Sequence, residues 1–204
     1  VYVGYKYYDT AKKEVAFPFG FGLSYTTFEY SDIKVSADSI KDTDTVTVSF
    51  KIKNTGSVDG AEVAQVYVND VESTIYRPVK ELRGFKKVFL KAGEEKEVSI
   101  TLDKRAFAYY NVNIGDWHVE SGEFKILVGA SSRDIKLEAS VNVESTVEAI
   151  VPDYKATAPS YYGANIMNVP ANEFEAVYGK PLPPAQGDKS QPLTILNTLE
   201  DAED

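Results

Sequence analysis

The chain has 204 residues, 43% of them hydrophobic, and a formal net charge of −9, which suits one domain with extensions or two small domains around one sizeable core. The acidic balance argues against nucleic acid or an anionic membrane surface as a partner, and no apolar run approaches the roughly 20 residues that span a bilayer. The absence of cysteine excludes disulfides and thiolate chemistry, but it leaves both a cytoplasmic and a secreted location open.

The N-terminal segment, residues 1–10, is short, β-branched and aromatic, which predicts a strand. Because no hairpin partner follows, we expect its partners to lie in a preceding domain. Residues 17–27, here called the aromatic joint, then alternate aromatic rings with Pro18, Gly20 and Gly22. Proline fixes φ and glycine reaches φ values that other residues avoid, so the joint is a poor helix or strand. Its aromatic rings favour burial between two folded domains, although an ordinary loop in the core of one domain fits the composition equally well.

From Phe28 onward, apolar and polar residues alternate, as in strands with one buried face. Turn signals, such as the polar residues 38–44, recur at roughly the 8–12-residue spacing of a β-sandwich. The residues expected to face the core are Val46, Val48, Phe50, Val98, Ile100 and Leu102. The sequence therefore predicts an all-β fold: an antiparallel, immunoglobulin-like sandwich of seven or eight strands over residues 28–146. Without cysteine, the fibronectin type III-like kind is favoured over the disulfide-pinned kind.

The last segment, residues 147–204, is rich in proline, which rules out long regular elements. One short helix is predicted over residues 172–178, with Asn172 as its N-cap and Gly179 closing it. Many apolar side chains occur between Tyr154 and Leu199, too many to leave in water. We therefore expect a mostly irregular extension that wraps around a large neighbouring surface.

Several motifs resemble one family of enzymes. Residues 2–9 and 17–26 look like the carboxy-terminal region of family 3 glycoside hydrolases of the β-glucosidase type. Residues 77–85 and 90–94 are similar to the fibronectin type III-like module of the same enzymes, and residues 174–183 resemble an extension that follows it in some members. These ordered motifs extend over nearly the whole chain. The resemblance implies that residues 1–27 are the last strand of an α/β domain and its linker.

The resemblance also implies where catalysis takes place. The family hydrolyses β-linked sugars with retention, using an Asp on a barrel domain and usually a Glu on an α/β domain, with carboxylates about 5 Å apart. Neither motif is present here, so we expect no catalytic residue, no cofactor and no metal site in this chain. The expected partners are the catalytic domains of the same enzyme, with β-linked glucosides or xylosides as its substrates. Lys6 departs from the usual Arg and loses the planar guanidinium.

Other side chains give weaker signals. The acidic pairs Glu94-Glu95 and Glu200-Asp201 are interpreted as surface charge, and the single histidine, His118, as a surface or interface residue. Trp117 could stack on a sugar ring, but packing is the favoured interpretation. We expect Asp9 to cap a turn.

Two hypotheses follow. The first is the non-catalytic end of a β-glucosidase-type hydrolase, which supports the catalytic domains. The alternative is a free-standing carbohydrate-binding or adhesion sandwich. Self-association into a homo-oligomer is left open. Under the first hypothesis both ends of the chain dock on the catalytic domains, and in isolation only residues 28–146 stay compact.

Overall fold

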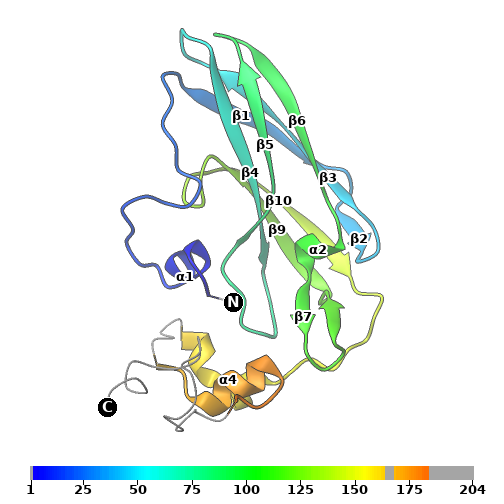
Figure 1. Ribbon diagram of the computed structural model, residues 1–204. Helices are drawn as coiled ribbons and strands as arrows, with labels where there is room; N and C mark the ends of the chain where they lie inside the picture. Colours follow the sequence, from blue (N-terminus) through cyan, green and yellow to red (C-terminus); the bar gives the residue numbers. More distant parts are fainter. Residues whose placement is uncertain (1, 164–167, 184–204) are drawn as a thin grey trace, which may run out of the picture.

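The computed structural model describes residues 2–163 and 168–183, which form an elongated β-sandwich with α3 and α4 beyond one end of it (Figure 1). The strands are β1 (Phe28–Val35), β2 (Ser39–Lys41), β3 (Val46–Asn54), β4 (Gly60–Asp70), β5 (Glu81–Leu90), β6 (Glu95–Leu102), β7 (Tyr109–Asn111), β8 (Asp116–His118), β9 (Gly122–Gly129) and β10 (Ile135–Glu144). The helices are α1 (Tyr5–Thr10), α2 (Lys104–Phe107), α3 (Tyr154–Thr157), the 3₁₀ helix η1 (Pro159–Gly163) and α4 (Ala171–Tyr178).

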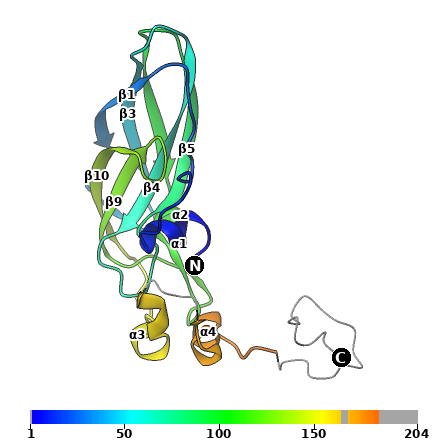
Figure 2. The ribbon, with the colours of Figure 1, turned by 90° about the vertical axis from the view of Figure 1, so that its left-hand side faces the viewer.

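Eight strands make up the sandwich. One sheet has the order β1-β3-β6, and the other has the order β2-β10-β9-β4-β5, while β7 and β8 form a separate hairpin. Figure 2 shows the two layers from the side. The predicted all-β sandwich is confirmed, and its strand pairs are antiparallel except for β2 with β10, which run parallel. Strand β2 lies within the polar turn predicted over residues 38–44, because Ile40 points inward and is buried there.

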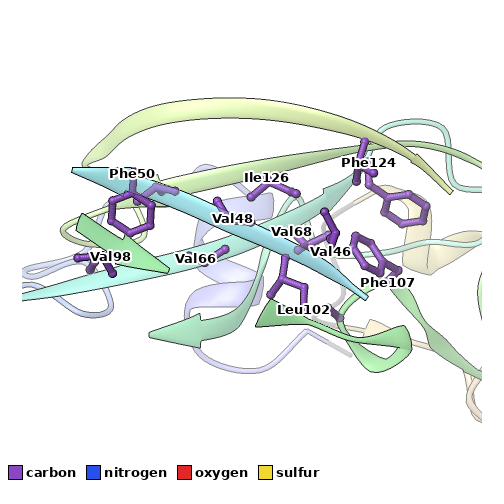
Figure 3. Packing of buried hydrophobic residues seen from close by; sticks show 14 of the residues in the cluster. Val46, Val48, Phe50, Val66, Val68, Val98, Leu102, Phe107, Phe124 and Ile126 are labelled. Carbon is purple, nitrogen blue, oxygen red and sulfur yellow. The ribbon is translucent and has the colours of Figure 1, made fainter. Parts of the chain in front are cut away.

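The core lies between the two sheets (Figure 3). Alternation in β3 points one set of side chains inward, and the register with β6 places Val98 opposite Phe50 and Ile100 opposite Val48. Five of the six predicted core residues are at most 1% exposed, and Ile100 is partly buried against them. The predicted core face is therefore confirmed.

The N-terminal segment differs from the prediction, because Tyr5–Thr10 form helix α1 and not a strand. A strand needs a paired neighbour for its backbone hydrogen bonds, and this segment is paired with no described strand. The backbone bonds locally instead, as the Tyr8 amide donates to the Gly4 carbonyl and the Ala11 amide to the Tyr7 carbonyl. Gly4 has a φ of 58° and allows the turn that starts the helix.

The C-terminal extension contains more helix than predicted. Helix α4 lies where one was expected, and Gly179 closes it with a φ of 80°. Pro170, and not Asn172, occupies the N-cap position, so Asn172 lies in the first turn. The sequence did not predict α3, which begins because the Asp153 side chain accepts from the Ala156 amide. Residues 184–204, which include Leu199 and Glu200-Asp201, lie outside the described residues.

The sandwich begins with its first strand in the chain and ends with its last. β1 begins at Phe28 and β10 ends at Glu144. The division of the chain into domains at residues 27 and 146 stays a prediction. Among residues 2–163 and 168–183, no helix is long and apolar enough to cross a membrane.

Candidate functional site

Helix α1 is held on the sandwich by a cluster of charges around Asp9. The Arg133 guanidinium, from the loop between β9 and β10, donates through Nε to Asp9 Oδ1 at 2.7 Å. Its Nη2 donates to the carbonyls of Tyr8 and Lys13. Lys80 Nζ lies 3.5 Å from Asp9 Oδ2, and the Asp9 side chain is only 3% exposed. Asp9 is therefore an anchor between two parts of the chain, and the expected role as a turn cap is wrong.

A second contact fixes the aromatic side of α1. The Tyr5 hydroxyl accepts from the Leu82 amide at 2.7 Å, and the Tyr5 ring stacks on Phe19 of the joint with centroids 4.4 Å apart. Its edge also meets Tyr67 of β4. Burial raises the pKa of the Tyr5 hydroxyl, so the group stays neutral at physiological pH. These contacts place α1 and the joint against the same sheet.

Lys6 reaches from α1 into a buried charge cluster on β5. Glu81 accepts from Lys6 at 2.6 Å, from Arg83 at 2.6 Å and from Arg77 at 3.2 Å. Arg77 also pairs with Asp70 at 3.0 Å. Burial alone would raise the pKa of Glu81, but the charges of Arg83, Lys6 and Arg77 outweigh it and hold that pKa below its usual value. Burial raises the pKa of Asp70 in spite of Arg77.

The sequence analysis missed both clusters. Glu81 and Arg83 are two residues apart in β5, so their side chains lie on the same face of the strand. Arg77 precedes Glu81 by four residues. The spacing within residues 77–83 therefore indicated local ion pairs. Asp9 and Arg133 are 124 positions apart, and no local pattern connects them.

A cavity of about 370 Å³ lies between the sandwich, the β7–β8 hairpin and the C-terminal helices. Aromatic rings and charged side chains line it together, among them Tyr76, Tyr109, Tyr110, Trp117, Arg77 and Glu81. The tyrosines at its base form a cluster in which Tyr76 stacks on Tyr161 of η1 and packs against Tyr154 of α3. The extension is therefore attached to the sandwich through tyrosine contacts.

Trp117 and His118 both lie on β8 beside this cavity. The Arg105 guanidinium lies 3.4 Å from the centroid of the Trp117 ring, and Tyr110 meets that ring edge to face. The half-buried Trp117 thus has packing partners, in line with the favoured interpretation. His118 is buried, with the edge of the Tyr109 ring against it, so of the two expected roles the surface one is wrong and the interface one stays a prediction.

Glu94 and Glu95 form separate ion pairs. Glu94 accepts from the Lys91 amide and pairs with Lys96, while Glu95 is exposed and lies 3.7 Å from Lys51, so both are surface charges as predicted. Within residues 2–163 and 168–183, no three Asp, Glu or His side chains come together as a metal site.

Comparison with known proteins agrees with this architecture. Residues 62–132 match the fibronectin type III-like domain. The thermostable β-glucosidase B of Acetivibrio thermocellus is 62% identical over 148 residues, covering 72% of this chain and 20% of that enzyme. The crystal structure of a Bifidobacterium adolescentis GH3 β-glucosidase matches with a TM-score of 0.69 and 44% identity, over 76% of this chain and 24% of that one. The chain carries the carboxy-terminal region of a family 3 glycoside hydrolase.

Two further relatives show how much of the matched enzymes this chain represents. An exo-α-(1→6)-L-arabinopyranosidase of Bifidobacterium breve is 52% identical over 144 residues, which cover 71% of this chain and 19% of that enzyme. β-Glucosidase 3B of Thermotoga neapolitana, solved in complex with glucose, matches with a TM-score of 0.63 and 47% identity, over 69% of this chain and 19% of that one. The chain thus spans about a fifth of the curated relatives it matches. Enzymes named for different sugars share this region.

Proposed function

We propose that this region is non-catalytic and supports the catalytic domains of a β-glucosidase-type hydrolase, which are the partners of this chain. The observation that carries the proposal is the anchoring of α1. Asp9 is fixed by Arg133 and Lys80, and Lys6 is fixed by Glu81. Since residues 1–27 connect the sandwich to the preceding domain in this proposal, a rigid α1 sets the orientation of that domain relative to the sandwich.

The chemistry of the buried carboxylates supports a structural role. A retaining glycosidase needs one carboxylate as nucleophile and a second as acid and base, about 5 Å away from it. Asp9, Asp70 and Glu81 instead each accept from at least one Lys or Arg side chain. We therefore assign hydrolysis of β-linked glucosides or xylosides to the preceding domains of the whole enzyme.

Two assays test this function. The isolated chain should show no turnover of aryl β-glucosides, and turnover that survives removal of contaminating enzyme would overturn the non-catalytic assignment. The catalytic portion, expressed without residues 1–204, should lose activity faster on heating than the whole enzyme does. Equal half-lives of the two proteins would contradict the supporting role.

The cavity beside Trp117 favours the alternative function, a carbohydrate-binding sandwich. An aromatic face suits the apolar C–H face of a pyranose, and Tyr110 at this cavity is 52% exposed. Titration calorimetry of the isolated chain with cellobiose tests it, and Tyr110→Ala is the matched variant. Binding by the wild-type chain that Tyr110→Ala abolishes would favour the alternative, and no heat at millimolar sugar would dismiss it.

A further inference from the structure

The outer surface of β4 and β5 carries large apolar side chains in contact with water. Phe85 is 67% exposed, Phe89 is 55% exposed, and Val63 of β4 lies on the same face. The joint adds Phe19 and Phe21, each nearly half exposed. We call these five residues the outer aromatic face. Exposed apolar side chains that gather on one face mark a surface for interaction with another body.

The strand register shows that these side chains share one face. Ala64 and Val66 of β4 point into the core, so the residues that alternate with them point outward. Gln65 is one of these outward residues, and Phe85 lies directly opposite it across the β4–β5 pair. Phe89 lies opposite Ala61 and points the same way. The two phenylalanines therefore face away from the core.

The joint lies against this face as well. The Gln65 side-chain amide donates to the Gly20 carbonyl at 3.1 Å, and the Ser132 amide donates to the Phe19 carbonyl at 2.8 Å. Gln65 thus connects the joint on one side with Phe85 on the other. Figure 2 shows the joint, in blue, running along the sheet that contains β4. The joint therefore contacts the sheet at Gln65, the residue that lies opposite Phe85.

The charge on this surface limits what can cover it. Lys87 lies between Phe85 and Phe89 in the outward row of β5 and is exposed. Within the part of the chain that the structure describes, Lys87 makes no ion pair. A complementary surface would be apolar and would bring a carboxylate to Lys87.

We propose that the outer aromatic face is the surface on which the preceding body of the same polypeptide docks. This inference rests on the proposed function and adds the surface through which support is given. The curated relatives are about five times longer than the matched region, so they contain a large further body. α1 and the joint connect to residues that precede this chain in such enzymes, and both lie on this face. A body that precedes α1 and the joint is thereby placed beside Phe85 and Phe89.

Chemical labelling of an introduced cysteine tests the docking surface. This chain has no cysteine of its own that would compete for the label. One variant carries Lys87→Cys on the outer aromatic face. Its matched control carries Ser99→Cys on the outward face of β6, in the opposite sheet. Each is labelled with a maleimide in the isolated chain and in the whole enzyme, and the modified peptide is measured by mass spectrometry. We expect position 87 to be labelled at least about tenfold more slowly in the whole enzyme, with position 99 unchanged.

Equal labelling of position 87 in both proteins would overturn the docking surface. It would leave the supporting function intact if the catalytic portion alone still loses activity faster on heating. Protection of position 87 in the isolated chain that disappears on dilution would also overturn the inference, since it would assign the face to a second copy of this chain.

A stability comparison gives an independent readout. The double variant Phe85→Ser with Phe89→Ser should melt within about 2 °C of the wild type in the isolated chain, because both rings are exposed there. In the whole enzyme the same pair should lower the melting temperature by about 5 °C. A shift of equal size in both proteins would contradict docking on this face.

Discussion

Arg133 and Asp9 are 124 positions apart in sequence, yet their Nε and Oδ1 atoms lie 2.7 Å apart. The pair joins the loop after β9 to the helix that precedes the whole sandwich. Because the same guanidinium also binds the Tyr8 and Lys13 carbonyls, it holds the backbone of α1 as well as its side chain. The N-terminal segment is therefore attached to the sandwich by side-chain contacts, and its order in the isolated chain stays a prediction.

This anchor predicts a change in protease sensitivity. Arg133→Ala removes the bonds to Asp9 and to the Lys13 carbonyl, so the exposed Lys12–Lys13 site should open more often. We expect trypsin to cut the isolated chain there at least about tenfold faster, because the loss of even one charge-assisted hydrogen bond costs about 1.5 kcal/mol. Lys136→Ala, which removes only the exposed pair with Asp134, is the control. An unchanged rate in Arg133→Ala would mean that the anchor does not hold α1.

The Glu81 cluster predicts a pH-dependent stability. The pKa of Glu81 is lowered in the folded chain, so its carboxylate stabilises the fold above the ordinary value of 4.5. That contribution is lost as the pH falls through the lower pKa of the folded form. Glu81→Gln leaves buried cations without their partner and should cost about 3 kcal/mol at pH 7.

The difference between the wild type and Glu81→Gln should shrink as the pH falls below 4.5. Denaturant melts of both proteins from pH 7 to pH 3 measure it. Asp70, whose pKa burial raises, acts in the opposite direction, but it is present in both proteins. A difference that stays constant over this range would contradict the ionic role of Glu81.

The core predicts a large cost for one truncation. Phe50 is 1% exposed and stacks on Tyr30 across the sheet, so Phe50→Ala should cost about 3–5 kcal/mol of unfolding free energy. Ser49→Ala, on the outward side of the same strand, should change it by less than about 0.5 kcal/mol. Denaturant melts that show a loss below roughly 1 kcal/mol for Phe50→Ala would mean that the register is wrong.

The contact between the joint and the sheet predicts the effect of Gly20→Ala. Gly20 has a φ of 78°, and a Cβ there would overlap the Gln65 side chain. Gln65 would then lose its bonds to the Gly20 and Ala130 carbonyls. We expect the hydrogen exchange of the Ser132 amide, which binds the joint, to accelerate while the core amides stay protected. Gly22→Ala, where a Cβ meets open space, should leave it unchanged.

The sequence predicted the sandwich because the signal for it is local. Alternation along β3 and β6 depends on residues within a few positions of each other, and burial of Phe50 and Val98 follows from it. The same reasoning failed for α1, where aromatic residues favour a strand but the segment pairs with no described strand and forms a helix. It also missed β2, a strand of only three residues within a polar stretch.

The candidate site was less predictable than the fold. Its anchors join residues that are far apart in sequence, such as Lys6 with Glu81 and Asp9 with Arg133. For each of these side chains, the sequence offers many other charged residues as possible ion-pair partners. Only the folded arrangement decides which charges are buried together.

The parallel pairing of β2 with β10 has a mechanical consequence. Suppose that the joint and the C-terminal extension are pulled apart until β1 detaches. The force then acts on the amino end of β2 and on the carboxyl end of β10. Because the two strands run parallel, they are pulled in opposite directions along their common axis. The paired residues, with Ser39 beside Asn142 and Lys41 beside Glu144, would then be loaded in shear, and their hydrogen bonds would resist together instead of opening one at a time. The sandwich would thus act as a stiff spacer when neighbouring parts of the enzyme move apart.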